Sequence, residues 1–221
     1  MAQDLFGFNP AQAWMYENGF YLTSSVARLG KLLAHYHLYR SITRLPGHVV
    51  ECGVYKGASL IRFASFRELL ESPYSRKVIG FDAFGAFPAQ ADPEDAAFIE
   101  RFEAAGGPGM PLEVMHRVMA YKGFENYELI AGDIVETVPR YVREHPELRI
   151  ALLHLDVDVY RPSVVTLEHL YPHVVRDGLT VFDDFGSVAG ETQAIDEFLA
   201  REAITVHKLP LSHSPAFCRK P

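Results

Sequence analysis

Residues 153–160 read Leu-His-Leu-Asp-Val-Asp-Val-Tyr, and residues 179–186 read Leu-Thr-Val-Phe-Asp-Asp-Phe-Gly. Each stretch is a short apolar run that ends in aspartates, as in a buried parallel strand followed by a polar loop. The carboxyl ends of parallel strands meet at one edge of a sheet, where open α/β proteins bind their ligands. Carboxylates gathered there repel one another unless a cation lies between them, and oxygen ligands suit Mg²⁺, Mn²⁺ or Ca²⁺. The two stretches therefore predict a site for a hard divalent cation.

Similar apolar runs occur earlier in the chain, at residues 48–53, 77–82 and 127–133, and most of them also end in an acid. Helical stretches separate most of these runs; apolar spacing and punctuation place them over residues 24–43, 59–70, 136–144, 163–175 and 192–202. Strands that alternate with helices predict a parallel, doubly wound sheet. Residues 204–210 and 216–219 read as two extended pieces, which predict an antiparallel hairpin at the edge of that sheet.

Two segments depart from this alternation. Residues 1–46 precede the first strand and predict a helical cap, whereas residues 84–126 are rich in Gly and Pro and are too long for an ordinary connection. We expect the second segment to be a lid or substrate loop. The chain has 221 residues and shows no repeat or interdomain linker, so we expect a single domain over residues 1–221.

Composition narrows the class of partner. The formal net charge is -7 and no Lys/Arg cluster is present, which argues against a nucleic-acid or anionic membrane surface. We expect a small-molecule partner and allow for a homo-oligomer. Two cysteines are too few for a disulfide framework, and the N-terminus lacks the basic and apolar regions of a secretion signal. With no apolar stretch of about 18 residues, the sequence predicts a cytoplasmic protein.

A glycine-containing turn follows the first predicted strand, with the sequence Glu-Cys-Gly-Val-Tyr-Lys-Gly-Ala-Ser over residues 51–59. Gly53 and Gly57 would let the backbone approach a ligand closely, and Asp82 ends the next strand, where it can accept hydrogen bonds from ribose hydroxyls. This pairing predicts an adenosine-type ligand. The spacing does not match Gly-x-Gly-x-x-Gly or a phosphate loop, which disfavours a dinucleotide or triphosphate. Glu51 would repel phosphate but tolerate a cationic ligand such as a sulfonium.

These motifs, taken together and in order, resemble the macrocin O-methyltransferase family of S-adenosylmethionine-dependent enzymes. The resemblance rests on residues 49–59, Gly-Phe-Asp-Ala-Phe at 80–84, Glu-Thr-Val-Pro at 136–139, residues 154–160, and Asp-Asp-Phe-Gly at 183–186. It extends from about Gly47 to the C-terminus. It implies a class I methyltransferase fold with a seven-strand, mostly parallel, Rossmann-like sheet. It also implies a Mg²⁺-dependent methyl transfer to a hydroxyl, typically on the sugar of a natural product.

The resemblance assigns residues to both parts of such a site. It places S-adenosylmethionine on the turn that holds Glu51, Gly53, Tyr55, Gly57 and Ser59, with Asp82 at the ribose and Asp133 by the adenine. It places Mg²⁺ on Asp156, Asp183 and Asp184. Family members commonly carry further helical segments at the N-terminus that help to enclose the acceptor, so the identity of the acceptor does not carry over.

Methyl transfer to a hydroxyl requires removal of the hydroxyl proton, because a sugar hydroxyl is a poor nucleophile near neutral pH. A divalent cation lowers the pKa of a bound hydroxyl, and two adjacent hydroxyls could chelate it, which suggests a vicinal diol as acceptor. His154, His213 or a free oxygen of Asp156 could accept the proton, and the sequence does not decide among them. We expect Asp158 to shape the loop.

Three other functions share parts of the pattern. A haloacid-dehalogenase-like phosphatase would need a lysine between its acidic motifs, and none occurs over residues 123–206. A glycosyltransferase that uses Asp-x-Asp to hold Mg²⁺ and a nucleotide diphosphate would leave the turn at residues 53–57 unexplained. A non-catalytic nucleoside-binding protein would give no reason for so many acids at one sheet edge.

Overall fold

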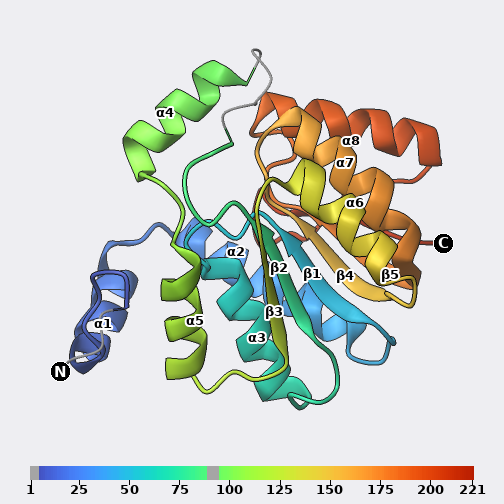
Figure 1. Ribbon diagram of the computed structural model, residues 1–221. Helices are drawn as coiled ribbons and strands as arrows, with labels where there is room; N and C mark the ends of the chain where they lie inside the picture. Colours follow the sequence, from blue (N-terminus) through green and yellow to red (C-terminus); the bar gives the residue numbers. More distant parts are fainter. Residues whose placement is uncertain (1–4, 89–94) are drawn as a thin grey trace.

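A seven-stranded sheet forms the centre of the computed structural model, which describes residues 5–88 and 95–221 (Figure 1). The strand order is β3-β2-β1-β4-β5-β7-β6. β1 to β5 pair in parallel, and β7 lies antiparallel between β5 and β6. The strands are β1 (His48–Cys52), β2 (Val78–Asp82), β3 (Tyr127–Ala131), β4 (Ile150–Leu155), β5 (Val174–Phe182), β6 (His207–Lys208) and β7 (Ala216–Arg219). The predicted doubly wound sheet with a C-terminal hairpin is confirmed.

Helices cover both faces of the sheet (Figure 1). α2, α3 and α5 contribute to an apolar cluster on one face, and α6, α7 and α8 contribute to a cluster on the other. The helices are α1 (Ala13–Thr23), α2 (Val26–Ile42), α3 (Ala58–Leu70), α4 (Ala96–Gly106), α5 (Leu112–Tyr121), α6 (Ile134–Glu144), α7 (Tyr160–Leu170) and α8 (Ala189–Glu202), with 3-10 turns at Pro10–Gln12 and Tyr171–His173.

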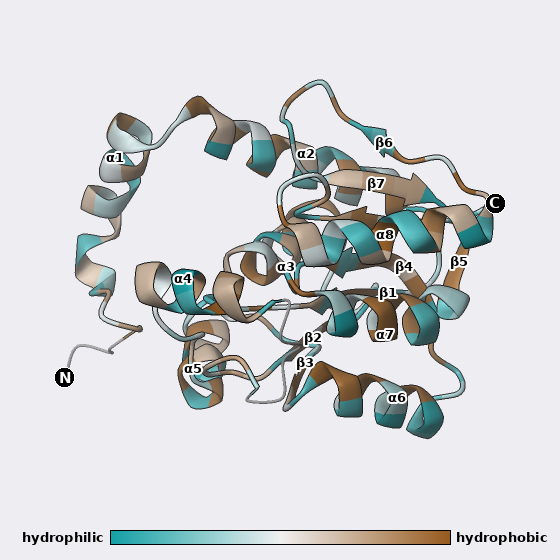
Figure 2. Cartoon of the chain, turned by 90° about the horizontal axis from the view of Figure 1, so that it is seen from above, coloured by the Kyte–Doolittle hydropathy of each residue, from teal (hydrophilic) through white to brown (hydrophobic). Residues whose placement is uncertain are grey.

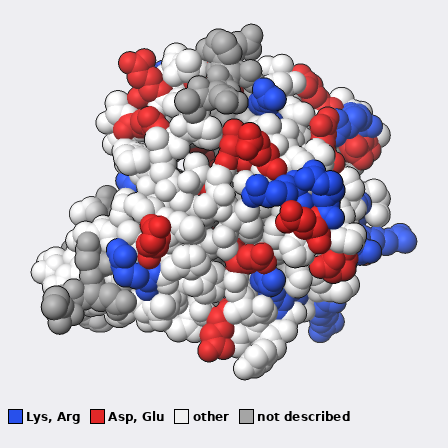
Figure 3. Space-filling model, viewed as in Figure 1, with Lys and Arg blue, Asp and Glu red and all other residues white. Residues whose placement is uncertain are grey.

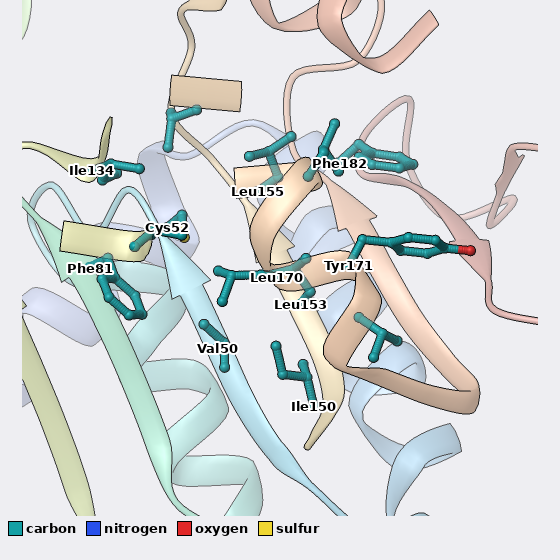
Figure 4. Close-up of a cluster of buried hydrophobic side chains, with 14 of the residues drawn as sticks. Val50, Cys52, Phe81, Ile134, Ile150, Leu153, Leu155, Leu170, Tyr171 and Phe182 are labelled. Carbon is teal, nitrogen blue, oxygen red and sulfur yellow. The ribbon is translucent and has the colours of Figure 1, made fainter. Parts of the chain in front are cut away.

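The central strands are buried on both faces, which explains why their sequences are continuous apolar runs. Figure 4 shows one of the two clusters, in which Val50 of β1, Leu153 of β4 and Phe182 of β5 lie near Leu170 of α7. All four side chains are fully buried. This packing fixes the strands firmly, so the loops that follow them start from a rigid edge.

The two segments that depart from the alternation are helical where the structure describes them. α1 and α2 lie within the predicted cap, and α1 stands away from the sheet (Figure 2). α4 and α5 lie within the predicted lid, of which residues 89–94 are outside the described residues. The sequence predicted α2 but not α1, α4 or α5.

Two predicted boundaries near the C-terminus were wrong. The helix expected over residues 163–175 is α7, which begins at Tyr160 and ends at Leu170, because Pro172 cannot donate an amide to continue it and a 3-10 turn follows. β5 begins at Val174, ahead of the apolar stretch that starts at Leu179. Val174 pairs with Ile150 before an irregularity in the register. Asp177 has a φ of 63°, so the strand bends there.

The surface carries both signs of charge. On the face shown in Figure 3, acidic and basic side chains are interspersed rather than gathered into a basic stripe. None of the helices in the described residues has the length and apolar character needed to cross a membrane.

Candidate active site

The order of the strands creates a crevice at the carboxyl edge of the sheet. β1 and β4 are neighbours in the sheet, but the connection after β1 leads to β2 and the connection after β4 leads to β5. The two connections therefore leave in opposite directions, and α/β proteins bind their ligands at such a point. The loops after β1, β2, β4 and β5 all meet here. They carry most of the residues for which the sequence predicted a function.

The turn after β1 lies directly against the loop after β4. Gly53 has a φ of 90°, and a Cβ atom built on it would lie only 1.7 Å from the carbonyl oxygen of Asp156. The amide of Asp156 donates to the carbonyl of Cys52 at 2.9 Å, which ties the same two loops together. Glycine is therefore required at position 53 both for its backbone angle and for the close approach of the two loops.

Asp82 organises the turn through its carboxylate. Its Oδ2 accepts hydrogen bonds from the amides of Val54 and Tyr55, both at 2.8 Å, and its Oδ1 accepts one from the amide of Phe84 at 2.6 Å. The side chain also lines the neighbouring cleft. Asp82 thus shapes the turn after β1, and its remaining acceptor capacity faces the space where a ribose was predicted.

This cleft has about 900 Å³ of empty space, including the part open to solvent. That size suits a small-molecule ligand. Four of the predicted cofactor residues line it, namely Gly53, Tyr55, Asp82 and Asp133. Phe87 and Phe102, from the segment predicted to be a lid or substrate loop, line it as well. Asp156 and Asp158 lie on its wall as well, so the cleft reaches the acidic loops.

The other predicted cofactor residues lie around the cleft without lining it. Glu51 is fully buried and hydrogen-bonds to His154, Gly57 is the N-cap of α3, and Ser59 is buried in the first turn of that helix. Asp133, which does line the cleft, is the N-cap of α6 and accepts a hydrogen bond from the amide of Val135 at 2.8 Å.

Asp156, Asp183 and Asp184 come together at the ends of β4 and β5. Each offers a carboxylate oxygen, and these oxygens lie within 4.8 Å of one another. Burial, followed by repulsion from Asp183 and Asp184, raises the pKa of Asp156 well above its usual value. A cation between the three would relieve that repulsion, and an all-oxygen set suits Mg²⁺. The residues therefore fit the predicted metal.

Asp183 has partners at both carboxylate oxygens. Its Oδ2 accepts a hydrogen bond from Lys31 of α2, and its Oδ1 lies 3.3 Å from Nε2 of His154 and 3.5 Å from Nε2 of His35. Burial would raise the pKa of Asp183, but the hydrogen bond with His154, the nearby His35 imidazole and the charge of Lys31 hold it well below its usual value. The carboxylate is therefore ionised.

His154 connects the two halves of the site. Its Nδ1 lies 2.9 Å from Oε1 of Glu51, and its Nε2 faces Asp183. Burial lowers its pKa, but the hydrogen bonds to Asp183 and Glu51 outweigh burial and raise it to about 9. An imidazolium with both nitrogens engaged has no lone pair to offer a substrate, so this geometry suits an orienting role better than that of a base.

His35 is fully buried with its ring edge-on to that of His154, 5.1 Å between the ring centroids, and it stays neutral. It stacks on Phe63, and neither ring nitrogen has a hydrogen-bond partner among the described residues. Burial lowers its pKa to about 4. His213, the other predicted candidate base, is exposed in the loop between β6 and β7.

Glu191 is a functional candidate that the sequence did not single out, and Asp158 is one for which the sequence predicted only a role in shaping the loop. The buried carboxylate of Glu191 accepts from the amides of Val157 (3.2 Å), Asp158 (3.0 Å) and Asp184 (3.2 Å), and so braces both acidic loops. Burial and the neighbouring Asp184 raise the pKa of Asp158 to about 7. The Asp-x-Asp spacing marked Asp158, but nothing in the local sequence marked Glu191.

Comparison with known proteins identifies the family. The model of the macrocin-O-methyltransferase family matches residues 27–220. Mycinamicin III 3''-O-methyltransferase of Micromonospora griseorubida is 27% identical over 80% of this chain and 69% of its own length. Demethyldecarbamoylnovobiocin O-methyltransferase of Streptomyces niveus is 27% identical over 74% of this chain and 64% of its own length. The chain thus spans roughly two thirds of these relatives.

Solved structures agree with the fold. The calicheamicin methyltransferase CalS11 superposes with a TM-score of 0.72 at 28% identity, over 96% of this chain and 86% of that protein. The O-methyltransferase NovP superposes with a TM-score of 0.73 at 20% identity, over 86% of this chain and 79% of its own, which supports the fold alone. The fold is that of class I methyltransferases. The chain belongs to the macrocin-O-methyltransferase family, and it is an S-adenosylmethionine-dependent O-methyltransferase.

The close approach at Gly53 gives a test of the cofactor turn. We expect Gly53→Ala to weaken the binding of S-adenosylhomocysteine at least tenfold, because the added Cβ would push the turn away from Asp156. Calorimetric titration with S-adenosylhomocysteine measures this loss.

Gly123→Ala is the matched control. Gly123 also has a positive φ, of 67°, but a Cβ there would meet nothing within 4 Å. We expect this variant to lose about 1 kcal/mol of stability and to bind S-adenosylhomocysteine normally. Equal affinity of Gly53→Ala and the wild type would contradict the assignment of the turn.

Proposed function

We propose that this chain transfers a methyl group from S-adenosylmethionine to a hydroxyl of a vicinal diol, on the sugar of a small-molecule natural product, with Mg²⁺ held by Asp156, Asp183 and Asp184. One observation carries the proposal. The cleft that is lined by the predicted cofactor residues also reaches Asp156, so a methyl donor and a cation-bound hydroxyl would be neighbours.

The donor would occupy the part of the cleft near Gly53, Tyr55 and Asp82. The turn brings backbone atoms close to the ligand, and Asp82 keeps acceptor capacity for hydroxyls of a ribose. Asp133 would lie by the adenine, at the start of α6. Glu51 is buried next to His154, and its negative charge would favour a cationic sulfonium in the nearby cleft.

The acceptor would approach from the acidic side of the cleft. When bound, Mg²⁺ would supply the positive charge that makes a hydroxyl more acidic, and its open coordination positions suit two adjacent hydroxyls. His154 holds Asp183 in one orientation, and Glu191 holds the backbone of both acidic loops. These contacts fix the carboxylates before any ligand arrives, which is how protein sites gain affinity and rate.

Asp158 is the residue that we propose as acceptor of the hydroxyl proton. It lines the cleft next to Asp156, whereas His154 is buried with both nitrogens engaged and His213 is exposed on its loop. Asp156 would serve the metal rather than the proton.

The relatives support a glycosidic acceptor. One acts on mycinamicin III and another on demethyldecarbamoylnovobiocin, and CalS11 is a TDP-rhamnose 3'-O-methyltransferase of calicheamicin biosynthesis. The lid offers an aromatic surface for a sugar at Phe102, which lines the cleft and lies 5.1 Å, centroid to centroid, from Tyr55 of the donor turn. We propose that α4 and α5 form a lid over the acceptor, in a single domain with an N-terminal cap.

Substitution of the acids tests the proposed metal site. We expect Asp156→Asn and Asp183→Asn each to lower kcat/KM about a thousandfold or more, because each removes a charged oxygen ligand, and to change the affinity for S-adenosylhomocysteine by less than about threefold. Methyl transfer to a panel of sugar diols, with and without Mg²⁺, measures the first effect. Asp196→Asn, on the exposed face of α8, should leave both quantities unchanged.

Two outcomes would contradict the proposal. Full turnover after removal of divalent cations with a chelator would exclude the metal dependence. Loss of S-adenosylhomocysteine binding in both variants would place these acids in the cofactor site instead.

Substitution of Asp158 tests the proton acceptor. We expect Asp158→Asn to lower kcat about a hundredfold or more while S-adenosylhomocysteine still binds, because the amide cannot take the hydroxyl proton. Single-turnover methylation at saturating acceptor measures the chemical step. A rate within about threefold of wild type would show that another group accepts the proton.

A further inference from the structure

Lys31 is bonded directly to one of the proposed metal ligands. Its ammonium donates a hydrogen bond to Oδ2 of Asp183, although Lys31 belongs to α2 and the acids belong to the loops after β4 and β5. A lysine ammonium is charged near neutral pH. It is therefore attracted by Asp183, which it contacts, and by the two proposed metal ligands beside Asp183.

A divalent cation and this ammonium would need the same oxygen. Oδ1 of Asp183 faces His154 and His35, so Oδ2 is the oxygen that remains for a metal, and Lys31 holds it. Two positive charges in contact with one carboxylate repel each other strongly in a buried site. Lys31 and the metal therefore exclude each other at Asp183.

Lys31 can withdraw without movement of its helix. The adjacent Gly30 is packed so closely that a Cβ there would lie 2.3 Å from the carbonyl oxygen of Leu211, and Ala34, Leu38 and Tyr39 anchor the rest of α2 in the core. The Lys31 side chain, in contrast, is 24% exposed. A flexible four-carbon stem allows the ammonium to rotate into solvent while the backbone stays in place.

We propose that Lys31 is the internal counter-cation of the acidic site, and that Mg²⁺ binds only when the Lys31 ammonium leaves Asp183. This inference rests on the proposed metal-dependent function and describes its regulation. Lys31 stabilises the crowded acids while the metal is absent. It also weakens metal binding, because the measured affinity equals the intrinsic affinity multiplied by the fraction of molecules in which Lys31 has withdrawn.

Metal binding to the full-length protein tests the proposal without any need for turnover. The free Mn²⁺ signal in electron paramagnetic resonance gives the affinity of the wild type, Lys31→Met and Lys31→Arg. We expect Lys31→Met to bind Mn²⁺ about tenfold or more tightly than the wild type, since its site is always accessible. Lys31→Arg keeps the charge and should retain the weaker affinity. A lysine with a merely structural role would give the opposite sign.

Lys77→Met is the matched control. Lys77 is also a half-buried lysine bonded to a carboxylate, at 2.8 Å from Glu128, but it lies at the other end of the sheet. Its loss changes the net charge equally, so its Mn²⁺ affinity should equal that of the wild type. Lys31→Gln replaces Lys31→Met if the latter does not fold, and S-adenosylhomocysteine binding confirms folding in every variant.

The outcomes separate this inference from the proposed function. If the wild type binds Mn²⁺ and Lys31→Met binds it equally or more weakly, the competition is excluded while the metal site stands. If Lys31→Met binds Mn²⁺ and the wild type does not, the competition is upheld and the metal dependence of the native protein is overturned. If no folded variant binds Mn²⁺, both are overturned.

Discussion

Repulsion among crowded, partly buried carboxylates at the ends of β4 and β5 is the constraint on which the rest of this site depends. Four carboxylates meet there, those of Asp156, Asp158, Asp183 and Asp184. Little solvent reaches them, so water screens their mutual repulsion poorly. Contacts of two kinds offset this repulsion. Lys31 and a protonated His154 bring positive charge to Asp183, and Glu191 binds the backbone amides of both loops.

The same contacts join the two halves of the active site. Glu51, at the end of β1, is linked through His154 to Asp183, and the turn after β1 touches the loop after β4 at Gly53. Because β1 and β4 are neighbours at the switch point of the sheet, backbone pairing would hold the proposed donor and acceptor sides in fixed register. In-line methyl transfer needs that kind of register, since small errors in the alignment of the reacting atoms cost rate.

The sequence predicted what depends on local pattern. Apolar runs that end in acids placed β1 to β4 within a few residues, and the acids at those ends meet as expected because parallel strands share one edge. The sequence pattern did not predict elements whose presence or length depends on tertiary contacts. α4 and α5 lie in a segment whose glycines and prolines suggested a loop, and the early start of β5 depends on pairing with Ile150.

In the candidate site, too, the sequence marked individual residues but not the tertiary contacts between them. Lys31 and His35 come from α2, whose sequence reads as an ordinary amphipathic helix, and only the packing of α2 on the sheet brings them to Asp183. The sequence marked both His154 and Glu51, but it did not predict that they pair. That pairing depends on the register of β1 with β4, which places the two residues side by side. Asp82 was predicted at a ribose, and the structure adds that it holds the turn itself.

Anomalous X-ray diffraction from crystals grown with Mn²⁺ and S-adenosylhomocysteine would test the central claim most directly. Such data locate the metal independently of any assumption about turnover. The account predicts one strong anomalous peak within coordination distance of Asp156, Asp183 and Asp184, with the Lys31 ammonium withdrawn from Asp183. An empty acid cluster with Lys31 still bonded to Asp183, or a peak bound elsewhere in the molecule, would contradict it.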